Sequence, residues 1–229
     1  MTDTSAALSV VIPAVNAAAA LAATIRSLPA DLVAEVIVSD GGSTDDTIRV
    51  ATATGASIVA GPAGRGGQLA RGAATARGDW LLFLHADTVL GMGAGAAMAA
   101  FMADPENLNR AGVFRFRLDD PRRRARALER VVALRCRLLA LPYGDQGLLM
   151  SRQFYDWIGG FGPMPLMEDV DMIRRIGRSR TCMLDASAIT SAARYIRDGY
   201  VRRMARNAFC LTLYGLGVSP QRISRVYDR

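Results

Sequence analysis

Lysine is absent from this sequence of 229 residues, and histidine occurs only once. All 28 basic residues are therefore arginines. Without lysine the chain cannot form a Schiff base with a carbonyl substrate, and it cannot supply the lysine of a Walker A phosphate loop. Both kinds of chemistry are excluded.

Cysteine and long apolar runs are also scarce. The three cysteines, Cys136, Cys182 and Cys210, are odd in number and lack C-x-x-C spacing, so we expect neither a disulfide framework nor a zinc site. A reducing cytoplasm is the simplest location for such a chain. The longest apolar stretch of the second half, 209–218, is far below the ~20 residues that span a bilayer, so no membrane-spanning helix is expected.

Positive charge is scarce in the first half of the chain. Residues 1–109 hold 5 arginines against 10 Asp and Glu (net −5), whereas residues 110–229 hold 23 against 11 (net +12). This asymmetry favours an anionic partner such as a membrane surface, a phosphorylated acceptor or nucleic acid. A solvated, arginine-rich surface explains it equally well. Nucleic acid is not expected, because no basic stretch carries the interleaved aromatic residues of a base-stacking platform.

What is present is an alternation of short apolar runs and helical segments, which predicts an α/β fold with parallel strands and right-handed crossovers. Strands are expected at 8–13, 34–40, 57–60, 80–84, 112–118 and 148–151. Helices are expected at 17–28, 45–54, 68–76, 93–102 and 122–141, and from the acidic cluster near 168 to 175. The C-terminal segment, 189–229, has apolar residues at helical spacing and either packs on the domain or lies at a membrane interface.

The most informative stretch is the apolar run 80–84, which stops at a polar cluster, His85-Ala86-Asp87-Thr88. Ligands of open α/β sheets bind just beyond the carboxyl ends of the strands, where Asp87 is expected. A carboxylate at that edge can hold a divalent cation against a phosphate. The simpler alternative is that Asp87 only caps the next turn.

The turn after the first strand argues against a dinucleotide fold. It reads Pro13-Ala-Val-Asn16 and not Gly-x-Gly-x-x-Gly, so a nicotinamide-dependent oxidoreductase is disfavoured. Asp40, at the end of the second strand, remains a candidate to hydrogen-bond a ribose or a base.

Two helical segments have two interpretations each. The basic helix 122–141 either packs on its sheet or contacts anionic lipid. Glu168, Asp169 and Asp171, after a Gly/Pro-rich loop, either cap a helix N-terminus or supply a general base at the edge of a pocket.

Six segments in this order resemble family 2 glycosyltransferases with a GT-A fold, in particular a small bacterial subgroup with a His-Ala-Asp-Thr signature. Each motif is weak alone, and the order makes the set specific. The matching segments are 9–16, 38–45, 64–68, 77–79 together with 85–88, 144–147 and 167–171, and Gly217-Val-Ser-Pro220 in the tail also looks like the subgroup.

The resemblance implies transfer of a sugar from a nucleotide-sugar donor to a nucleophilic acceptor, with inversion. It implies a GT-A fold: a mostly parallel central sheet flanked by helices, with a C-terminal helical extension. The whole chain, 1–229, would be one domain, with a nucleotide-sugar half at 8–115, an acceptor half at 116–188 and a basic helical tail at 189–229.

The resemblance also implies residue roles. Asp87 matches the last acid of the Asp-x-Asp motif and would hold Mg²⁺ or Mn²⁺ on the diphosphate, Asp169 would be the base, and Glu168 would support it. Asp145 and Gln146 would contact the acceptor. The residues expected to contact the donor are Pro13, Asn16, Asp40, Arg65, Gln68, His85 and Ala86.

Three positions depart from the family pattern. His85 replaces the first acid of the metal motif, and it either ligates the ion or, as we favour, hydrogen-bonds within its turn. Ala17 replaces a glutamate after Asn16, and Gly41 replaces a second aspartate after Asp40. These departures bear on the affinity of the site for the metal ion and on which nucleotide it binds.

The acceptor is not identified by the sequence and belongs to one of three classes: a lipid, a saccharide or a small molecule. A nucleotidyltransferase is disfavoured because no Gly-x-Gly-x-Arg/Lys loop follows the first strand. A non-enzymatic alternative is a degenerate nucleotide-binding protein on the inner face of the cytoplasmic membrane, which the basic second half supports.

Overall fold

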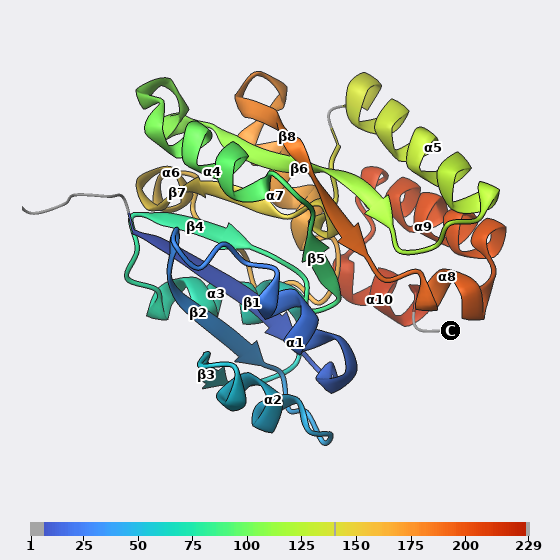
Figure 1. Cartoon of the computed structure of the whole chain (residues 1–229). Coiled ribbons are helices and arrows are strands. Elements are labelled where there is room, and N and C mark those ends of the chain that lie inside the picture. The colour runs from blue at the N-terminus through green and yellow to red at the C-terminus, as the bar shows by residue number, and fades with distance from the viewer. Residues whose placement is uncertain (1–6, 140, 228–229) are drawn as a thin grey trace, which may run out of the picture.

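The computed structural model describes residues 7–139 and 141–227, and its central feature is a curled sheet of eight strands (Figure 1). The strands lie in the order β3-β2-β1-β4-β7-β6-β8-β5. Their bounds are β1 Leu8–Ala14, β2 Val33–Asp40, β3 Ser57–Ala60, β4 Trp80–Phe83, β5 Thr88–Leu90, β6 Ala111–Leu118, β7 Leu148–Ser151 and β8 Thr181–Thr190.

The strands β3, β2, β1 and β4 run parallel, as the alternation of strands and helices predicts. Both faces of this half are covered by helices, which is why β4 is a continuous buried apolar run and β1 is apolar except for Ser9. The register pairs Ala14 with Asp40 and Val11 with Phe83. The segments that follow β1, β2 and β4 therefore meet at one edge of the sheet.

The other half of the sheet is mixed. β7 is antiparallel to β4 and β6, β8 is parallel to β6, and β5 is antiparallel to β8, so four of the seven pairings are parallel. The sequence does not predict β5 and β8. β8 is rich in alanine and serine and contains Asp185, which gives it a weak strand pattern, and it runs across the predicted tail boundary at 189.

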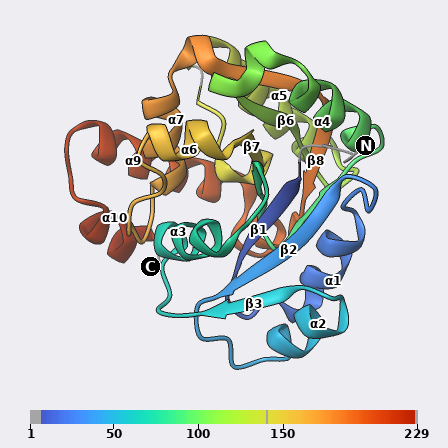
Figure 2. The ribbon, with the colours of Figure 1, turned by 90° about the vertical axis from the view of Figure 1, so that its left-hand side faces the viewer.

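Helices form a layer on each face of the sheet (Figure 2). Leu21 of α1 and Met98 of α4 are buried on one face, and Leu69 of α3, Phe154 of α6 and Met172 of α7 on the other. The helices are α1 Ala18–Arg26, α2 Thr47–Ala53, α3 Arg65–Thr75, α4 Ala94–Ala103, α5 Arg123–Leu139, α6 Arg152–Trp157, α7 Glu168–Ile176, α8 Ala193–Asp198, α9 Tyr200–Gly215 and α10 Pro220–Tyr227.

Helix α3 begins at Arg65, three residues before the predicted start at 68. Glycines at 66 and 67 lower the helix propensity of the first turn, which hides this start in the sequence. Arg65 therefore lies on the first turn of the helix.

Helix α5, Arg123–Leu139, lies within the predicted helix 122–141, of which residue 140 is outside the described residues. The expectation that this helix packs on its sheet is confirmed, because Leu128 and Val132 join Phe116 of β6 and Tyr200 of α9 in one apolar cluster.

The C-terminal helices α8–α10 pack on the rest of the chain through one face. Cys210 of α9 and Ile223 of α10 are fully buried beside Met167 and Val170. This face of the C-terminal segment therefore packs on the domain, which is the first of the two alternatives predicted for it. Within 7–139 and 141–227, no helix has both the length and the apolar composition needed to cross a bilayer.

Candidate functional site

A cavity of about 460 Å³ opens at the carboxyl edge of β1 and β4, and we call it the β1 pocket. Its walls include Pro13, Ala14, Val15, Asn16, Ala17, Gly64, Arg65, Gln68, His85, Ala86, Asp87, Pro165, Ser191 and Arg194. Six of the seven residues expected to contact the donor line this pocket together with Asp87, and Asp40 does not.

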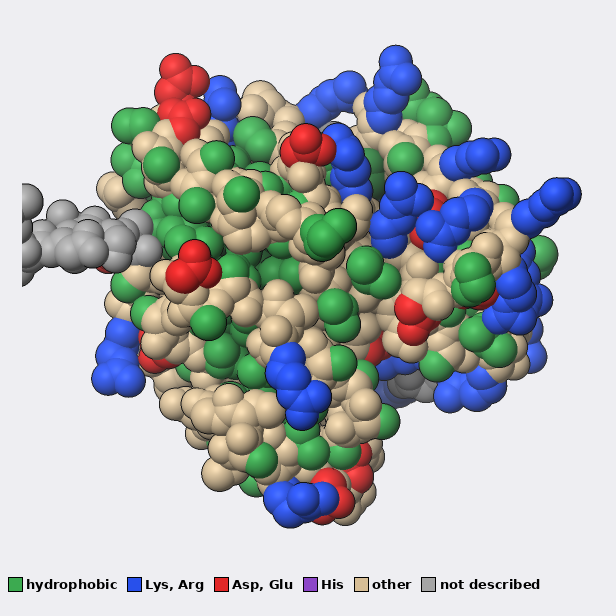
Figure 3. All heavy atoms as spheres, viewed as in Figure 1, with side chains coloured by type: hydrophobic (Ala, Val, Ile, Leu, Met, Phe, Trp, Pro, Cys, Tyr) green, Lys and Arg blue, Asp and Glu red, His purple; other side chains and the backbone are tan. Residues whose placement is uncertain are grey.

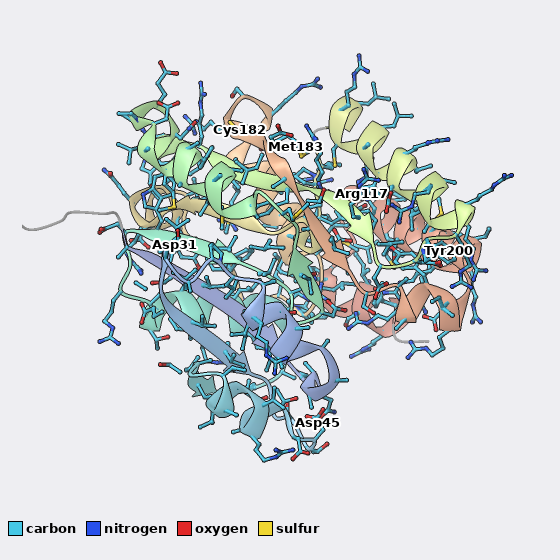
Figure 4. The ribbon with its side chains drawn as sticks, in the orientation of Figure 1. Asp31, Asp45, Arg117, Cys182, Met183 and Tyr200 are labelled. Atoms are coloured by element: carbon cyan, nitrogen blue, oxygen red, sulfur yellow. The ribbon has the colours of Figure 1, made fainter. Side chains whose placement is uncertain are left out.

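The loop after β2 is held by Asp40 and Asn16. The carboxylate of Asp40 is buried and accepts hydrogen bonds from the backbone N–H groups of Gly42 (2.8 Å) and Ser43 (3.0 Å). Asn16 Oδ1 accepts one from the N–H of Thr44 (2.8 Å), in the loop whose outer end is marked by Asp45 in Figure 4. Asp40 thus shapes the loop, and its direct contact with a nucleoside stays a prediction.

Gln68 joins three elements of the pocket wall. Its buried amide Nε2 donates to the carbonyl oxygens of Ala14 at the end of β1 (2.9 Å) and of Ser39 in β2 (2.8 Å). These two bonds fix the first turn of α3 against the edge of the sheet. Arg65, on the same turn, is thereby held at the mouth of the pocket.

The start of α3 also approaches the segment that leads into α7. The N–H of Gly66 donates to the carbonyl oxygen of Met164 (3.0 Å), and a Cβ atom at Gly66 would lie 2.2 Å from the carbonyl oxygen of Gly162. Only glycine permits this approach.

Replacing Gly66 or Gly67 by alanine should have opposite effects. Alanine raises helix propensity by about 1 kcal/mol at either position, but at Gly66 the clash with backbone costs on the order of 1–3 kcal/mol or more. A Cβ at Gly67 meets nothing closer than Arg71 Nη1 at 3.9 Å, so Gly67→Ala is the matched control. Denaturant unfolding should find Gly67→Ala stabilised and Gly66→Ala destabilised. Equal stabilisation would contradict the close approach.

His85 lines the β1 pocket. Burial, together with the charges of Arg65 and Arg194, lowers the pKa of His85 well below its ordinary value, so the imidazole is neutral. A Cβ at Gly144 would lie 2.6 Å from His85 Nε2, so the ring packs tightly against the loop at 144–147.

Asp87 is the carboxylate that lines the β1 pocket. Its side chain is 25% exposed, and its Oδ2 lies 4.0 Å from Arg194 Nη2. Its backbone carbonyl accepts a hydrogen bond from the N–H of Ser191 (3.0 Å), which ties the end of β8 to this turn. Among the hydrogen bonds of the described residues, none joins the Asp87 carboxylate to a backbone N–H, so turn capping does not explain this side chain.

A second cavity, of about 110 Å³, lies between the loop at 144–147, the start of α7 and helices α8–α10, and we call it the α7 pocket. It shares Arg65, His85, Asp87, Ser191 and Arg194 with the β1 pocket. The two cavities therefore meet at one wall.

Asp169 lines the α7 pocket with its carboxylate fixed by the backbone. Its Oδ2 accepts a hydrogen bond from the N–H of Gly144 (2.8 Å) and its Oδ1 one from the N–H of Val170 (2.7 Å). Met167, the residue before α7 begins, has φ +68° and caps the helix in the left-handed region. Met167 and Asn16 are the two non-glycine residues with positive φ in the described chain, and both border the cavities, where such strain is typical of functional sites.

Glu168 lies behind Asp169 and is 1% exposed. Its Oε1 is 3.3 Å from Arg65 Nη1, and its Oε2 has no partner in the described structure. Burial raises the pKa of Glu168 to about 7, against the opposing charge of Arg65. Glu168 itself does not line the α7 pocket, whereas Arg65 does. We therefore assign Glu168 the role of positioning the Arg65 guanidinium.

The two residues predicted to contact the acceptor point to different places. Asp145 lines the α7 pocket, and its buried Oδ1 has no hydrogen-bond partner among the described residues. Gln146 does not line that pocket, and its buried amide donates to the carbonyl oxygen of Phe114 (2.9 Å). Gln146 therefore holds the loop on β6.

The Asp145 carboxyl should make stability depend on pH. Burial raises its pKa to about 6, from 3.8, so between these values the folded state keeps a proton that the unfolded state has released. The stability that this proton gives is fully present below pH 3.8 and is lost as the pH rises through 6, by about 3 kcal/mol in total, of which about 2 kcal/mol falls between pH 4.5 and pH 7.5. The variant Asp145→Asn lacks this titration, so relative to wild type it should gain about 2 kcal/mol in unfolding free energy between pH 4.5 and pH 7.5. A difference that does not change with pH would contradict the burial of this carboxyl.

Several residues of the shared site were missed by sequence reasoning. They come from the segment after β8 and from the terminal helices: Ser191, Arg194, Tyr195, Arg203, Asn207, Cys210 and Tyr227. Arg203 is 7% exposed and donates to Asp198 (3.1 Å) and to the hydroxyl of Tyr227 (2.9 Å). The only available signal was the density of arginines in the tail.

The residues around Asp87 fit a divalent ion that is shared with a substrate. Mg²⁺ and Mn²⁺ prefer oxygen ligands, and Mg²⁺ commonly takes one or two carboxylates with the rest supplied by phosphates and water. Asp87 offers one partly exposed carboxylate at the wall of both cavities. No group of three or more His, Cys, Asp or Glu side chains in the described part of the chain is arranged to hold a metal alone.

Comparison with known proteins agrees with this geometry. The family model "Glycosyl transferase family 2" matches residues 9–165. A search of curated proteins found no match.

Solved structures with the same fold include glucosyl-3-phosphoglycerate synthase from Mycobacterium tuberculosis in complex with Mn²⁺ and UDP-glucose. It is 24% identical, covers 81% of this chain and 70% of its own, and has a TM-score of 0.58. A mycobacterial protein is 25% identical over 81% of this chain and 66% of its own, with a TM-score of 0.56.

The mixed sheet between two helical layers is thus the predicted GT-A fold, and the family match runs from β1 to the segment before α7. With that match spanning well over half of its length, the chain belongs to glycosyltransferase family 2.

Proposed function

We propose that this protein transfers a sugar from a nucleotide-diphospho-sugar in the β1 pocket to an acceptor hydroxyl in the α7 pocket, with inversion. The observation that carries the proposal is the shared wall. Asp87 lines both cavities, and Asp169 lines the second one with its carboxylate held by two backbone N–H groups.

Asp169 is proposed as the general base. It takes the proton of the acceptor hydroxyl while the acceptor oxygen bonds to the anomeric carbon of the sugar. The bond from that carbon to the diphosphate oxygen breaks, and its electron pair leaves with the nucleoside diphosphate. Attack from the face opposite the leaving group inverts the configuration. Glu168 acts through Arg65, to which it is paired at 3.3 Å.

The charge on the departing diphosphate needs cations. A Mg²⁺ or Mn²⁺ ion held by Asp87 would stabilise that charge as a Lewis acid. Arg65 and Arg194 line both cavities and would add two fixed positive charges beside it. His85 is neutral and replaces a carboxylate, so it would hold the ion less strongly, and the charge of Arg194 would share in neutralising the diphosphate.

The donor is proposed to be a uridine nucleotide sugar. Glucosyl-3-phosphoglycerate synthase has been crystallised with Mn²⁺ or Mg²⁺ and UDP, and with UDP-glucose, phosphoglyceric acid or glycerol 3-phosphate, which supports a metal and a uridine nucleotide here. Pro13, Asn16, Asp40, Gln68 and Ala86 would surround the nucleoside. The acceptor is a lipid, a saccharide or a small molecule, and Asp145 would accept a hydrogen bond from it.

The stereochemical outcome tests this function. The protein should be incubated with α-linked UDP-sugars, Mn²⁺ and a panel of acceptors, and the products examined by proton NMR. A β-linked product, with release of the nucleoside diphosphate, is the expected result. An α-linked product would contradict attack on the face opposite the diphosphate.

We further propose that the chain is one domain, with a nucleotide-sugar half up to about residue 115, an acceptor half up to about 188 and a helical tail from 189. We also propose that the protein works in the cytoplasm, at the inner face of the membrane. The basic second half favours this location. The second candidate function, a nucleotide-binding membrane-surface protein without catalysis, rests on the same basic surface. Vesicle binding without turnover of any nucleotide-sugar would favour it.

A further inference from the structure

Helix α5 has apolar side chains on a buried face and also on an exposed side. Ala125, Leu128 and Val132 are buried against the sheet and α9. On the outer side, three large apolar side chains are exposed at helical spacing: Val131 (50%), Leu134 (55%) and Leu138 (59%). We call these three residues the outer stripe. At least half of each of these side chains is open to solvent, and three exposed residues in register are more than scattered surface apolar positions.

Arginines border the outer stripe along one line. Arg123, Arg130 and Arg137 are spaced by seven residues, which places them on one side of the helix surface next to the stripe. Within the described chain, none of the three has a carboxylate within ion-pair distance. Figure 3 shows arginine side chains gathered over this part of the molecule.

The groove beside these arginines is also basic. It has a volume of about 760 Å³ and lies between α5 and strands β6 and β8, where Arg117 and Met183, both labelled in Figure 4, line it. Its one carboxylate, Glu129, is 7% exposed and is already paired with Arg117 (2.8 Å) and Arg126 (2.9 Å). Arg130 and Arg137 therefore add uncompensated positive charge to the groove.

We propose that α5 docks the protein on a bilayer that contains anionic phospholipid. The outer stripe lies in the boundary between headgroups and acyl chains, and Arg123, Arg130 and Arg137 bind lipid phosphates. An amphipathic helix with an apolar face bordered by arginines is the pattern of an interfacial helix. This inference rests on the membrane location proposed above and names the element that provides it.

Charge argues for a lipid over a second copy of the chain. Glu129 is the only acidic residue of α5 and it is buried, so two copies meeting at their outer stripes would bring arginine against arginine. Phospholipid phosphates provide the opposite charge along the whole line.

Vesicle co-sedimentation of the full chain tests the proposal. Wild type should bind vesicles of phosphatidylcholine with phosphatidylglycerol, and not phosphatidylcholine alone. The variant Arg123→Gln/Arg130→Gln/Arg137→Gln should lose on the order of 100-fold in affinity, because each arginine near an anionic surface contributes about fivefold. The control Arg26→Gln/Arg49→Gln/Arg77→Gln removes the same charge from the other half of the chain and should bind as wild type.

The stripe has its own variant and control. Leu134→Gln/Leu138→Gln should weaken vesicle binding, whereas Ile48→Gln/Leu108→Gln, at two exposed positions elsewhere, should not. Equal binding to both kinds of vesicle, or an arginine variant that binds as wild type, would overturn the proposal. So would a stripe variant that only converts a dimer to a monomer in light scattering.

Donor binding measured on the same samples separates the two proposals. The α5 variants should keep the metal-dependent thermal shift of wild type with UDP-glucose. If vesicle binding fails while that shift persists, only the docking inference falls. Loss of the shift in wild type itself would overturn the proposed function.

Discussion

Asp169→Asn should bind the donor with the affinity of wild type but transfer sugar about 10²- to 10⁴-fold more slowly. This factor is the usual contribution of a positioned general base. The amide keeps the shape of the side chain, and its oxygen can still accept the hydrogen bond from the N–H of Gly144. What it cannot do is take the acceptor proton. The measurement is release of nucleoside diphosphate, including the slow release that accompanies transfer to water.

The same helix offers a matched control for Asp169→Asn. Asp171 lies two residues further on, does not line either cavity, and pairs with Arg175 at 2.7 Å. Asp171→Asn should therefore transfer sugar at nearly the wild-type rate. If both variants were equally slow, the effect would come from the helix and not from a base. If Asp169→Asn stayed active, the assignment of Asp169 would be wrong.

Asp87→Asn should remove the metal-dependent part of donor binding. Among the residues that line both cavities in the described chain, Asp87 is the one carboxylate. Changing a residue that only hydrogen-bonds a metal ligand typically costs about 10–100-fold in affinity. Loss of the ligand itself should therefore raise the Kd for the donor in Mn²⁺ by at least on the order of 10–100-fold. In EDTA the variant and wild type should bind alike. Calorimetric titration with UDP-glucose, with and without Mn²⁺, makes the measurement.

Asp185→Asn provides the control for Asp87→Asn, because Asp185 is exposed on β8 and, among the described residues, forms an ion pair only with Arg115. It should keep the wild-type response to Mn²⁺. An unchanged affinity of Asp87→Asn in Mn²⁺ would contradict the metal role of Asp87. In that case Arg65 and Arg194 would be left as the partners of the diphosphate.

The sequence predicts the part of the site that is formed by residues close to one another in the chain. The run from Trp80 to Leu84 is apolar because it is buried on both faces, and it must stop where the sheet edge meets the cavity, so the position of Asp87 follows from the pattern. The acidic start of α7 could be identified in the same way.

Long-range placement could not be predicted. Arg194 reaches Asp87 only because β8 crosses the sheet beside β6, and β8 has a weak strand pattern. Gln146 is adjacent to Asp145 in sequence but faces β6, since neighbouring side chains of a short loop need not share a side. Asp40 ends a strand as expected, yet its own loop takes up its carboxylate.

The most direct measurement for the central claim is thermal unfolding of wild type with UDP-, GDP- and dTDP-sugars, each with Mn²⁺ and with EDTA. A ligand at a hundred times its Kd stabilises the folded state by about 2.7 kcal/mol. For a chain of this size that is a rise in Tm of roughly 5–10 °C. We predict such a rise with one nucleotide, UDP, and mainly in the presence of Mn²⁺. No rise with any nucleotide-sugar, with or without metal, would contradict a donor site at the carboxyl edge of β1 and β4.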